Sequence, residues 1–228
     1  TKNKLDDERR TVDAHQVLLD LDPSNKVALQ VLADHYAKNG EWDYLAGLYE
    51  DQLASGAVKP ADELGVWVQL AMLNWKTRQK PAAAEPYFDK IRRVDPTHAG
   101  MLDFFRERCA ESEPARLMSI LTDAQRALAD EGQKAKLAEE IAGLAEGQEN
   151  ARRAIEQYKT ILRSDPDNAD ARDKLKALYL ETESYNALVE LLRQDLGRVA
   201  DDDREAKLEL LREMAGIYRD KMSSETAL

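Results

Sequence analysis

The sequence predicts an all-α fold in which antiparallel helical hairpins repeat along the chain. Glycine and proline are scarce, at 10 and 7 of 228 residues, and no stretch alternates apolar and polar residues for long enough to indicate a β-strand. An Asp-Pro pair recurs at Pro23, Pro96 and Pro166, and each pair ends a segment of helical apolar periodicity. Repetition at a period of tens of residues is typical of stacked helical architectures.

Local stop signals divide the chain into about twelve helices. Proline lacks a backbone donor and clashes with the preceding turn, so each Asp-Pro pair stops one helix and lets the next one open after it. Further breaks are Asn39-Gly40, Ala54-Ser55-Gly56, Gln79-Lys80-Pro81, Ser112-Glu113-Pro114, Asp130-Glu131-Gly132, Gly147, Thr182-Glu183-Ser184 and Gly197. In chain order, the predicted elements are a helix at 6–21, hairpins at 26–58, 61–96, 99–130, 135–166 and 169–200, and a last helix at 202–222. A continuous coiled coil is the alternative, but breaks roughly every 15 to 18 residues interrupt any sustained heptad seam.

Overlaying the chain on itself predicts which side chains form the core. The hairpin that follows each Asp-Pro pair aligns apolar positions at the same spacing: Leu32, Tyr36, Leu45 and Leu48, then Phe105, Cys109, Met118 and Leu121, then Leu175, Tyr179, Leu188 and Leu191. We also interpret four recurring tyrosines as core packing residues: Tyr36, Tyr158, Tyr179 and Tyr218.

Composition restricts the class of partner. The net charge of −11 and pI near 4.9 have the wrong sign for neutralising phosphates, so nucleic acid and anionic membranes are not expected as partners. The longest apolar stretch, 66–73, contains Gln69 and is far shorter than the roughly 20 residues that cross a bilayer. Cys109 is the only cysteine, which excludes an internal disulfide and leaves the compartment undetermined, with the cytoplasm slightly favoured. Because the chain begins at Thr1 rather than methionine, we expect an excerpt of a longer protein.

Two segments carry a resemblance to a known repeat. Ile141-Ala142-x2-Ala145 followed by Ala154-x3-Tyr158-x2-Ile161-x4-Pro166 resembles a tetratricopeptide repeat, and the segment 23–49 is similar. The resemblance implies one domain over 1–228, a right-handed superhelical solenoid of about five hairpins with an extra helix at each end. It also implies small residues where helices approach closely, supplied by Ala33, Ala71, Ala142, Ala154 and Ala215. The sequence departs from the repeat pattern at Leu45, at Leu117 or Met118, and at Leu188, Arg106 and Lys176.

In proteins similar to this one, the first helix of each hairpin lines a concave groove. The resemblance therefore implies a partner-binding groove, lined by Gln30, Asp34, Lys38, Val68, Met72, Trp75, Lys76, Asp103, Glu107, Glu111, Lys136, Glu139, Asp170, Asp173, Arg212 and Arg219. The middle of that set is acidic. The corresponding positions do not reproduce the Lys, Asn and Arg cluster with which related domains grip a C-terminal carboxylate.

The helix expected at 62–78 has two apolar faces. Trp67, Leu70 and Ala71 form one face, while Val68, Met72 and Trp75, spaced i, i+4 and i+7, form another. Trp75 is therefore either an exposed anchor for an apolar side chain of a partner or a residue packed against a neighbouring helix. We favour packing, because tryptophan is buried on average.

No residue pattern indicates catalysis, a cofactor or a metal. His15, His35 and His98 lie on different repeats without a second ligand at helical spacing, and neither a phosphate-binding loop nor a nucleophile motif is present. We therefore expect a non-catalytic scaffold that holds a protein or peptide with some Lys or Arg and a large apolar residue. The alternative is a spacer or self-association module that uses its end helices, and a helical enzyme is a third hypothesis.

Overall fold

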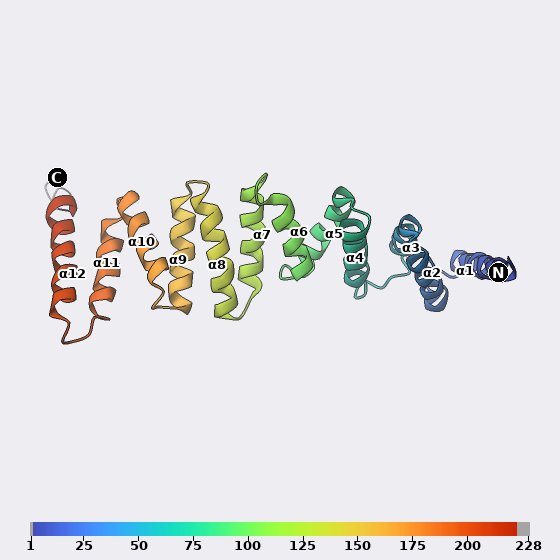
Figure 1. The fold of residues 1–228 in the computed structure, drawn as a ribbon, viewed down its shortest axis with the longest axis horizontal. Coiled ribbons are helices and arrows are strands. Elements are labelled where there is room, and N and C mark those ends of the chain that lie inside the picture. The colour runs from blue at the N-terminus through green and yellow to red at the C-terminus, as the bar shows by residue number, and fades with distance from the viewer. Residues whose placement is uncertain (1, 223–228) are drawn as a thin grey trace. The chain divides into compact units, whose positions relative to one another are not determined.

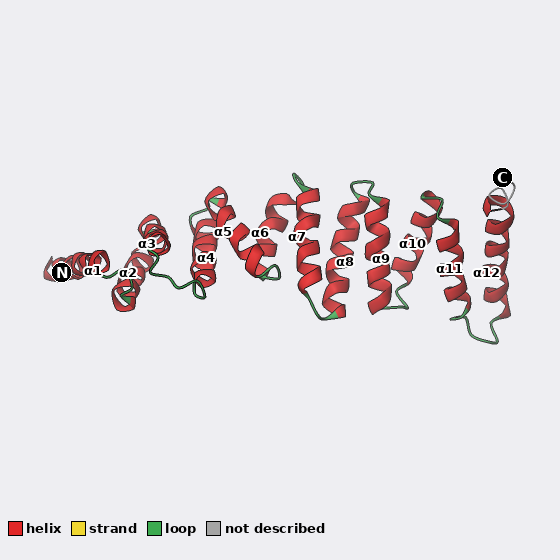
Figure 2. Cartoon of the chain, turned by 180° about the vertical axis from the view of Figure 1, so that it is seen from behind, coloured by secondary structure: helices red, strands yellow, loops and turns green. Residues whose placement is uncertain are grey.

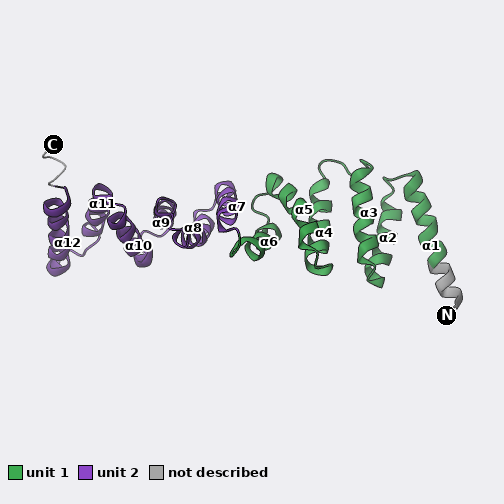
Figure 3. Ribbon diagram, turned by 90° about the horizontal axis from the view of Figure 1, so that it is seen from above, with its two compact units in different colours: residues 1–112 green, residues 113–228 purple. Residues whose placement is uncertain are grey.

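The structure is a computed structural model that describes the backbone of residues 2–222 and the side chains from residue 9 onward. Every described element is helical and no strand occurs among these residues (Figures 1 and 2). The all-α, helical-repeat prediction is therefore confirmed. The chain divides into two compact units, residues 1–112 and 113–228 (Figure 3). The extent of a single solenoid over 1–228 and its handedness stay predictions.

Unit 1 contains six α-helices and one π-helical turn within the described residues. They are α1 (Lys2–Leu21), α2 (Lys26–Asn39), α3 (Trp42–Ala54), α4 (Glu63–Met72), η1 (Leu73–Thr77), α5 (Pro81–Val94) and α6 (Ala99–Cys109). The first two predicted hairpins correspond to α2 with α3 and to α4 with α5, and α2 also packs on α1. The boundary between the units falls inside 99–130, the range of the third predicted hairpin.

Unit 2 contains the remaining helices of the described chain. They are α7 (Pro114–Ala127), α8 (Glu131–Glu146), α9 (Ala151–Ser164), α10 (Ala169–Glu181), α11 (Tyr185–Leu196), α12 (Arg204–Ile217) and the π-helical turn η2 (Tyr218–Met222). Each helix packs on its neighbours along the chain, and the contact between α8 and α9 is the most extensive. The hairpins expected at 135–166 and 169–200 correspond to α8 with α9 and to α10 with α11, and the expected last helix corresponds to α12.

The Asp-Pro linkers share one hydrogen-bond pattern that explains both the stop and the restart. The Asp N–H continues the outgoing helix, for example from Asp95 to the Ile91 carbonyl at 2.7 Å. The same Asp side chain accepts the N–H two residues later, at 3.0 Å from Thr97. A capping side chain then opens the next helix, as His98 Nδ1 accepts from the Met101 N–H at 3.2 Å. Asn25 and Asn168 supply this cap after the other two pairs, so the linker satisfies backbone groups that helix ends leave unpaired.

The aligned core positions are confirmed, because all twelve side chains are buried. Tyr36, Tyr158 and Tyr179 are buried as expected, but the prediction for Tyr218 is wrong. Its side chain is 41% exposed, and its hydroxyl accepts from Arg193 Nη2 at 2.8 Å. Ala215 is exposed too, because α12 turns Met214 and Ile217 towards α11 instead.

The helix expected over 62–78 is not continuous. After Met72 the backbone widens into η1, with the Arg78 N–H donating to the Leu73 carbonyl five residues back at 2.9 Å. Leu73, Asn74 and Trp75 are all buried, which three consecutive residues of a regular α-helix do not achieve on one packed face. The π-helical turn therefore changes the direction in which the following side chains project from the helix.

Candidate functional site

The predicted groove residues lie in both units, and most are exposed. The exposed ones are Gln30, Asp34, Lys38, Lys76, Asp103, Glu107, Glu111, Lys136, Glu139, Asp170, Asp173, Arg212 and Arg219. Val68 and Met72 are half-buried. Trp75 is buried. Unit 1 brings together Trp75, Lys76 and Glu107, whereas unit 2 brings together Glu139 and Asp170.

Trp75 belongs to the core of unit 1. Its side chain is only 6% exposed, and its ring meets Phe88 and Phe104 edge to face at centroid distances of 5.8 and 5.5 Å. The indole Nε1 donates to Glu107 Oε1 at 3.2 Å. The packing interpretation therefore holds, and a side chain buried in this way cannot serve as an exposed anchor.

Lys76 and Glu107 are engaged with each other and with that ring. The Lys76 ammonium lies 3.2 Å from the Trp75 ring centroid and 3.4 Å from Glu107 Oε2. The hydrogen bond from Trp75, and secondarily Lys76, lowers the pKa of the Glu107 carboxyl. These groups, with Gln79, Pro81 and Arg108, line an open hollow of about 470 Å³. Its charges are largely matched internally, which favours a structural role.

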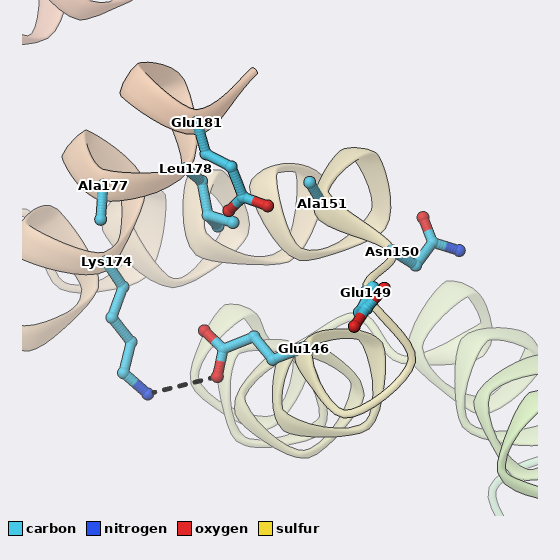
Figure 4. A pocket seen from close by; sticks show the side chains of 8 residues that line it. All are labelled: Glu146, Glu149, Asn150, Ala151, Lys174, Ala177, Leu178 and Glu181. Carbon is cyan, nitrogen blue, oxygen red and sulfur yellow. Dashed lines mark ion pairs between the residues drawn. The ribbon is translucent and has the colours of Figure 1, made fainter.

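A different hollow in unit 2 is walled by carboxylates. Its volume is about 280 Å³. Figure 4 shows the side chains that line it, which come from the end of α8, the following loop, the start of α9 and the C-terminal part of α10. They are Glu146, Glu149, Asn150, Ala151, Lys174, Ala177, Leu178 and Glu181. None of these residues is among the groove residues that the sequence predicts.

A second hollow of about 320 Å³ shares Lys174 with the first. It is lined by Glu139, Gly143, Tyr158, Ile161, Asn168, Asp170, Ala171 and Lys174. Two predicted groove residues, Glu139 and Asp170, are on its wall. We call the two hollows together the acidic groove, because five carboxylates line them and Lys174 is the one cation among their described lining residues.

Lys174 connects the two hollows and neutralises part of this charge. Its Nζ lies 3.7 Å from Glu146 Oε2 and 3.8 Å from Asp170 Oδ2. A hydrogen bond with the Tyr158 hydroxyl, together with these two carboxylates, raises the pKa of Lys174 above its usual value. Lys174 therefore stays charged. It forms ion pairs with Glu146 and Asp170 but not with Glu149 or Glu181.

Tyr158 fixes the inner wall. Its hydroxyl donates to Glu146 Oε1 at 2.5 Å. Burial, followed by this bond to Glu146, raises the pKa of Tyr158 to about 12. The phenol is consequently neutral over the physiological range and holds the carboxylate of Glu146 in place.

The α8–α9 loop presents Glu149 at the rim. The Asn150 N–H donates to the Ala145 carbonyl at 2.9 Å, and the Asn150 side chain caps α9 through the Arg153 N–H at 3.1 Å. This tight reversal leaves Glu149 with a φ of 54°. Glu181 faces the same hollow from α10. Among the described residues, neither Glu149 nor Glu181 has an ion-pair partner.

The residues that the sequence analysis missed fall into two kinds. Lys174 and Glu181 are seven residues apart on one helix, so they share a face with Leu178, and that stripe could have been found from periodicity. Glu149 lies in a turn, where periodicity assigns no face. Sequence alone could not have placed it on the same hollow as Glu181.

Among the described residues, no helix is both long and apolar enough to cross a bilayer. No group of three or more His, Cys, Asp or Glu side chains lies close enough together to hold a metal ion in that part of the chain.

Comparison with known proteins finds similarity only among solved structures. The chain matches no protein-family model and no curated protein. The crystal structure of YrrB, described as a TPR protein with an unusual peptide-binding site, is 13% identical over 88% of this chain and 99% of its own, with a TM-score of 0.42. A crystal structure of MamA protein is 16% identical over 75% and 90%, with a TM-score of 0.40. BtubC from P. vanneervenii is 16% identical over 94% and 92%, with a TM-score of 0.37. These TM-scores are below 0.5, and the function proposed below rests instead on contacts within this chain.

Proposed function

We propose that this chain is a non-catalytic protein-interaction scaffold whose acidic groove binds a peptide segment carrying a lysine or arginine and a large apolar residue. The observation that carries the proposal is the pair of unpaired carboxylates, Glu149 and Glu181, facing one hollow. A cationic side chain between them would gain two charge-assisted hydrogen bonds. The adjoining side chains of Ala177 and Leu178 supply apolar contact.

The size and exposure of the site favour a flexible segment of modest affinity. A hollow of about 280 Å³ is at the lower end of pockets that enclose small ligands, so it admits a side chain rather than a folded domain. Exposed ion pairs contribute up to about 1 kcal/mol each. Affinity therefore depends on combining the charged contact with apolar contact along the groove.

The experiment uses two labelled peptides that differ at one position. A fluorescein-labelled peptide of sequence Gly-Ser-Leu-Ala-Arg-Ala-Ser-Gly is titrated with the protein and followed by anisotropy, beside the same peptide with glutamate in place of arginine. We expect only the arginine peptide to bind. The double variant Glu149→Gln with Glu181→Lys should weaken it about ten-fold, the equivalent of two exposed ion pairs.

The matched control is Glu209→Lys with Glu213→Gln, two exposed carboxylates on α12 that together undergo the same change of charge. Its affinity for the arginine peptide should equal that of the unaltered protein. Equal binding of both peptides would show that charge does not select the ligand. Equal loss in the control would show that net charge rather than the acidic groove attracts it.

A second candidate function is self-association through the end helices. Val17 and Leu21 are exposed on α1, and Leu208 and Leu211 are exposed on α12. Each pair leaves apolar surface that a further helix could cover.

A further inference from the structure

Unit 2 contains another hollow with the opposite charge. Its volume is about 400 Å³, and it is lined by α9, α10 and α11. Leu175, Tyr179 and Leu191 are buried side chains of this lining, and Leu162 is a half-buried one. A hollow of this size with these apolar side chains in its lining accepts a large aliphatic or aromatic side chain.

Two basic side chains of α9, Lys159 and Arg163, flank the apolar part of that lining. They are four residues apart, so they project from the same face of the helix, with Cβ atoms about 6 Å apart. Both are exposed, and neither has an ion-pair partner among the described residues. The ammonium of Lys159 lies 5.6 Å from the Tyr179 ring centroid, which holds the charge over the hollow.

The other polar groups at this hollow do not cancel that charge. Gln194 is neutral, and Glu190 is engaged by Arg193 Nη1 at 3.4 Å. The surface is thus locally cationic in a chain whose net charge is −11. Charge of the minority sign beside buried apolar side chains gives electrostatic complementarity to an acidic apolar partner.

We propose that this α9–α11 surface binds an acidic amphipathic helix of a partner protein. The helix would place a leucine or phenylalanine in the hollow and two carboxylates, one helical turn apart, against Lys159 and Arg163. This surface and the acidic groove share no lining residue, although α9 and α10 contribute residues to both. The unit would therefore present two binding surfaces of opposite charge preference.

The test titrates the full chain into a peptide that carries fluorescein on its N-terminus, fluorescein-Ala-Ala-Glu-Ala-Leu-Leu-Glu-Ala-Ala-amide, and follows anisotropy. We expect saturable binding that weakens as salt is added, because exposed charges are screened. Lys159→Glu with Arg163→Glu should weaken binding at least ten-fold, since attraction becomes repulsion at both positions. Leu162→Ala should weaken it about three-fold through lost apolar contact.

The matched control is Arg204→Glu with Arg212→Glu, the same two charge reversals at exposed residues of α12 that do not line this hollow. It should leave the affinity unchanged, and circular dichroism should show that every variant remains folded. An excess of the arginine peptide should not displace the acidic one, so failure here is separable from failure of the acidic groove. No saturable binding, or equal loss in Arg204→Glu with Arg212→Glu, would overturn the proposal. A dimer that forms without peptide and is abolished by Lys159→Glu would also overturn it, by placing a second copy on this surface.

Discussion

At the residue scale, Trp75 shows how an apolar pattern acquires a structural role. Its two ring contacts and its bond to Glu107 use both the apolar face and the polar edge of the indole. The same side chain buries its ring in the core of unit 1 and orients the Glu107 carboxylate at the neighbouring open hollow. Its residue type suggested a binding hot spot, but its surroundings make it a core residue.

We expect Trp75→Ala to destabilise the protein by about 3–5 kcal/mol, because truncating a buried tryptophan loses apolar contact and leaves a cavity. Trp75→Phe should cost less, since it keeps an aromatic ring between Phe88 and Phe104. Urea unfolding followed by far-ultraviolet circular dichroism measures both. An Ala variant with an unchanged midpoint would contradict burial of the side chain in solution.

Tyr158 predicts a dependence of stability on alkaline pH. Its pKa is raised from the ordinary 10.0 to about 12, so the folded state disfavours the phenolate. The stabilisation is complete below pH 10 and is lost as pH rises from about 10 to about 12. Tyr158→Phe should lower stability by about 1 kcal/mol at neutral pH through loss of the bond to Glu146, and it should lose less stability than the unaltered protein above pH 10.

The control for this effect is Tyr185→Phe, which changes a half-buried tyrosine of α11 whose hydroxyl has no hydrogen-bond partner among the described residues. Its urea midpoint should follow that of the unaltered protein at each pH. A Tyr158→Phe variant with the same alkaline loss as the unaltered protein would assign that loss to other tyrosines, among them Tyr87, whose pKa is also raised to about 12 by burial and Glu50.

At the scale of elements, the Asp-Pro linkers explain why the repeat boundaries are so regular. Asp165 accepts the Asp167 N–H at 3.2 Å, and Asn168 then accepts the Ala171 N–H at 2.9 Å. Two side chains thus satisfy backbone donors between α9 and α10. The proline between them cannot donate, so it fits without cost.

We expect Asn168→Ala to cost about 1 kcal/mol, the usual effect of removing an N-cap acceptor. Asn168→Asp should retain most of the stability, because the carboxylate accepts the same bond and suits the positive end of the helix. Thermal unfolding measures the series. Asp173→Ala, an exposed change inside α10, is the control, and an equal loss there would argue against a capping effect.

The helix boundaries were largely predictable, whereas the π-helical turn was not. Proline, glycine and capping residues act on the adjacent turn, so their effect can be inferred from the sequence. The widening at η1 depends on packing. Asn74 is 0% exposed, its Oδ1 accepts from Arg78 Nη1 at 2.5 Å, and Arg78 Nε donates to Asp43 Oδ1 on α3 at 2.9 Å. A contact between residues 35 positions apart has no local signal.

At the scale of the whole molecule, net charge opposes association of identical copies. The value of −11 gives repulsion that salt screens over a Debye length of about 10 Å at 0.1 M. The exposed leucines on α12 favour association instead. The balance decides between the two candidate functions.

We expect static light scattering to give the mass of a monomer at low salt over a wide range of protein concentration, because repulsion exceeds the contact of two exposed leucines. Any association should grow with added salt. A dimer that persists at low salt and disappears in Leu208→Gln with Leu211→Gln would favour the self-association function. Glu209→Lys, which alters charge but no leucine, is the comparison.

The sequence by itself determined the helical class, the positions of the linkers, the repeating core and the acidic character of the surface. Each follows from local backbone preferences, apolar periodicity or composition, none of which requires knowledge of distant neighbours. Only the tertiary structure decided that Trp75 is buried, that Tyr218 is exposed and that Glu149 and Glu181 line one hollow. Those outcomes depend on which side chains the packing of separate helices brings together, and local preferences leave that packing open.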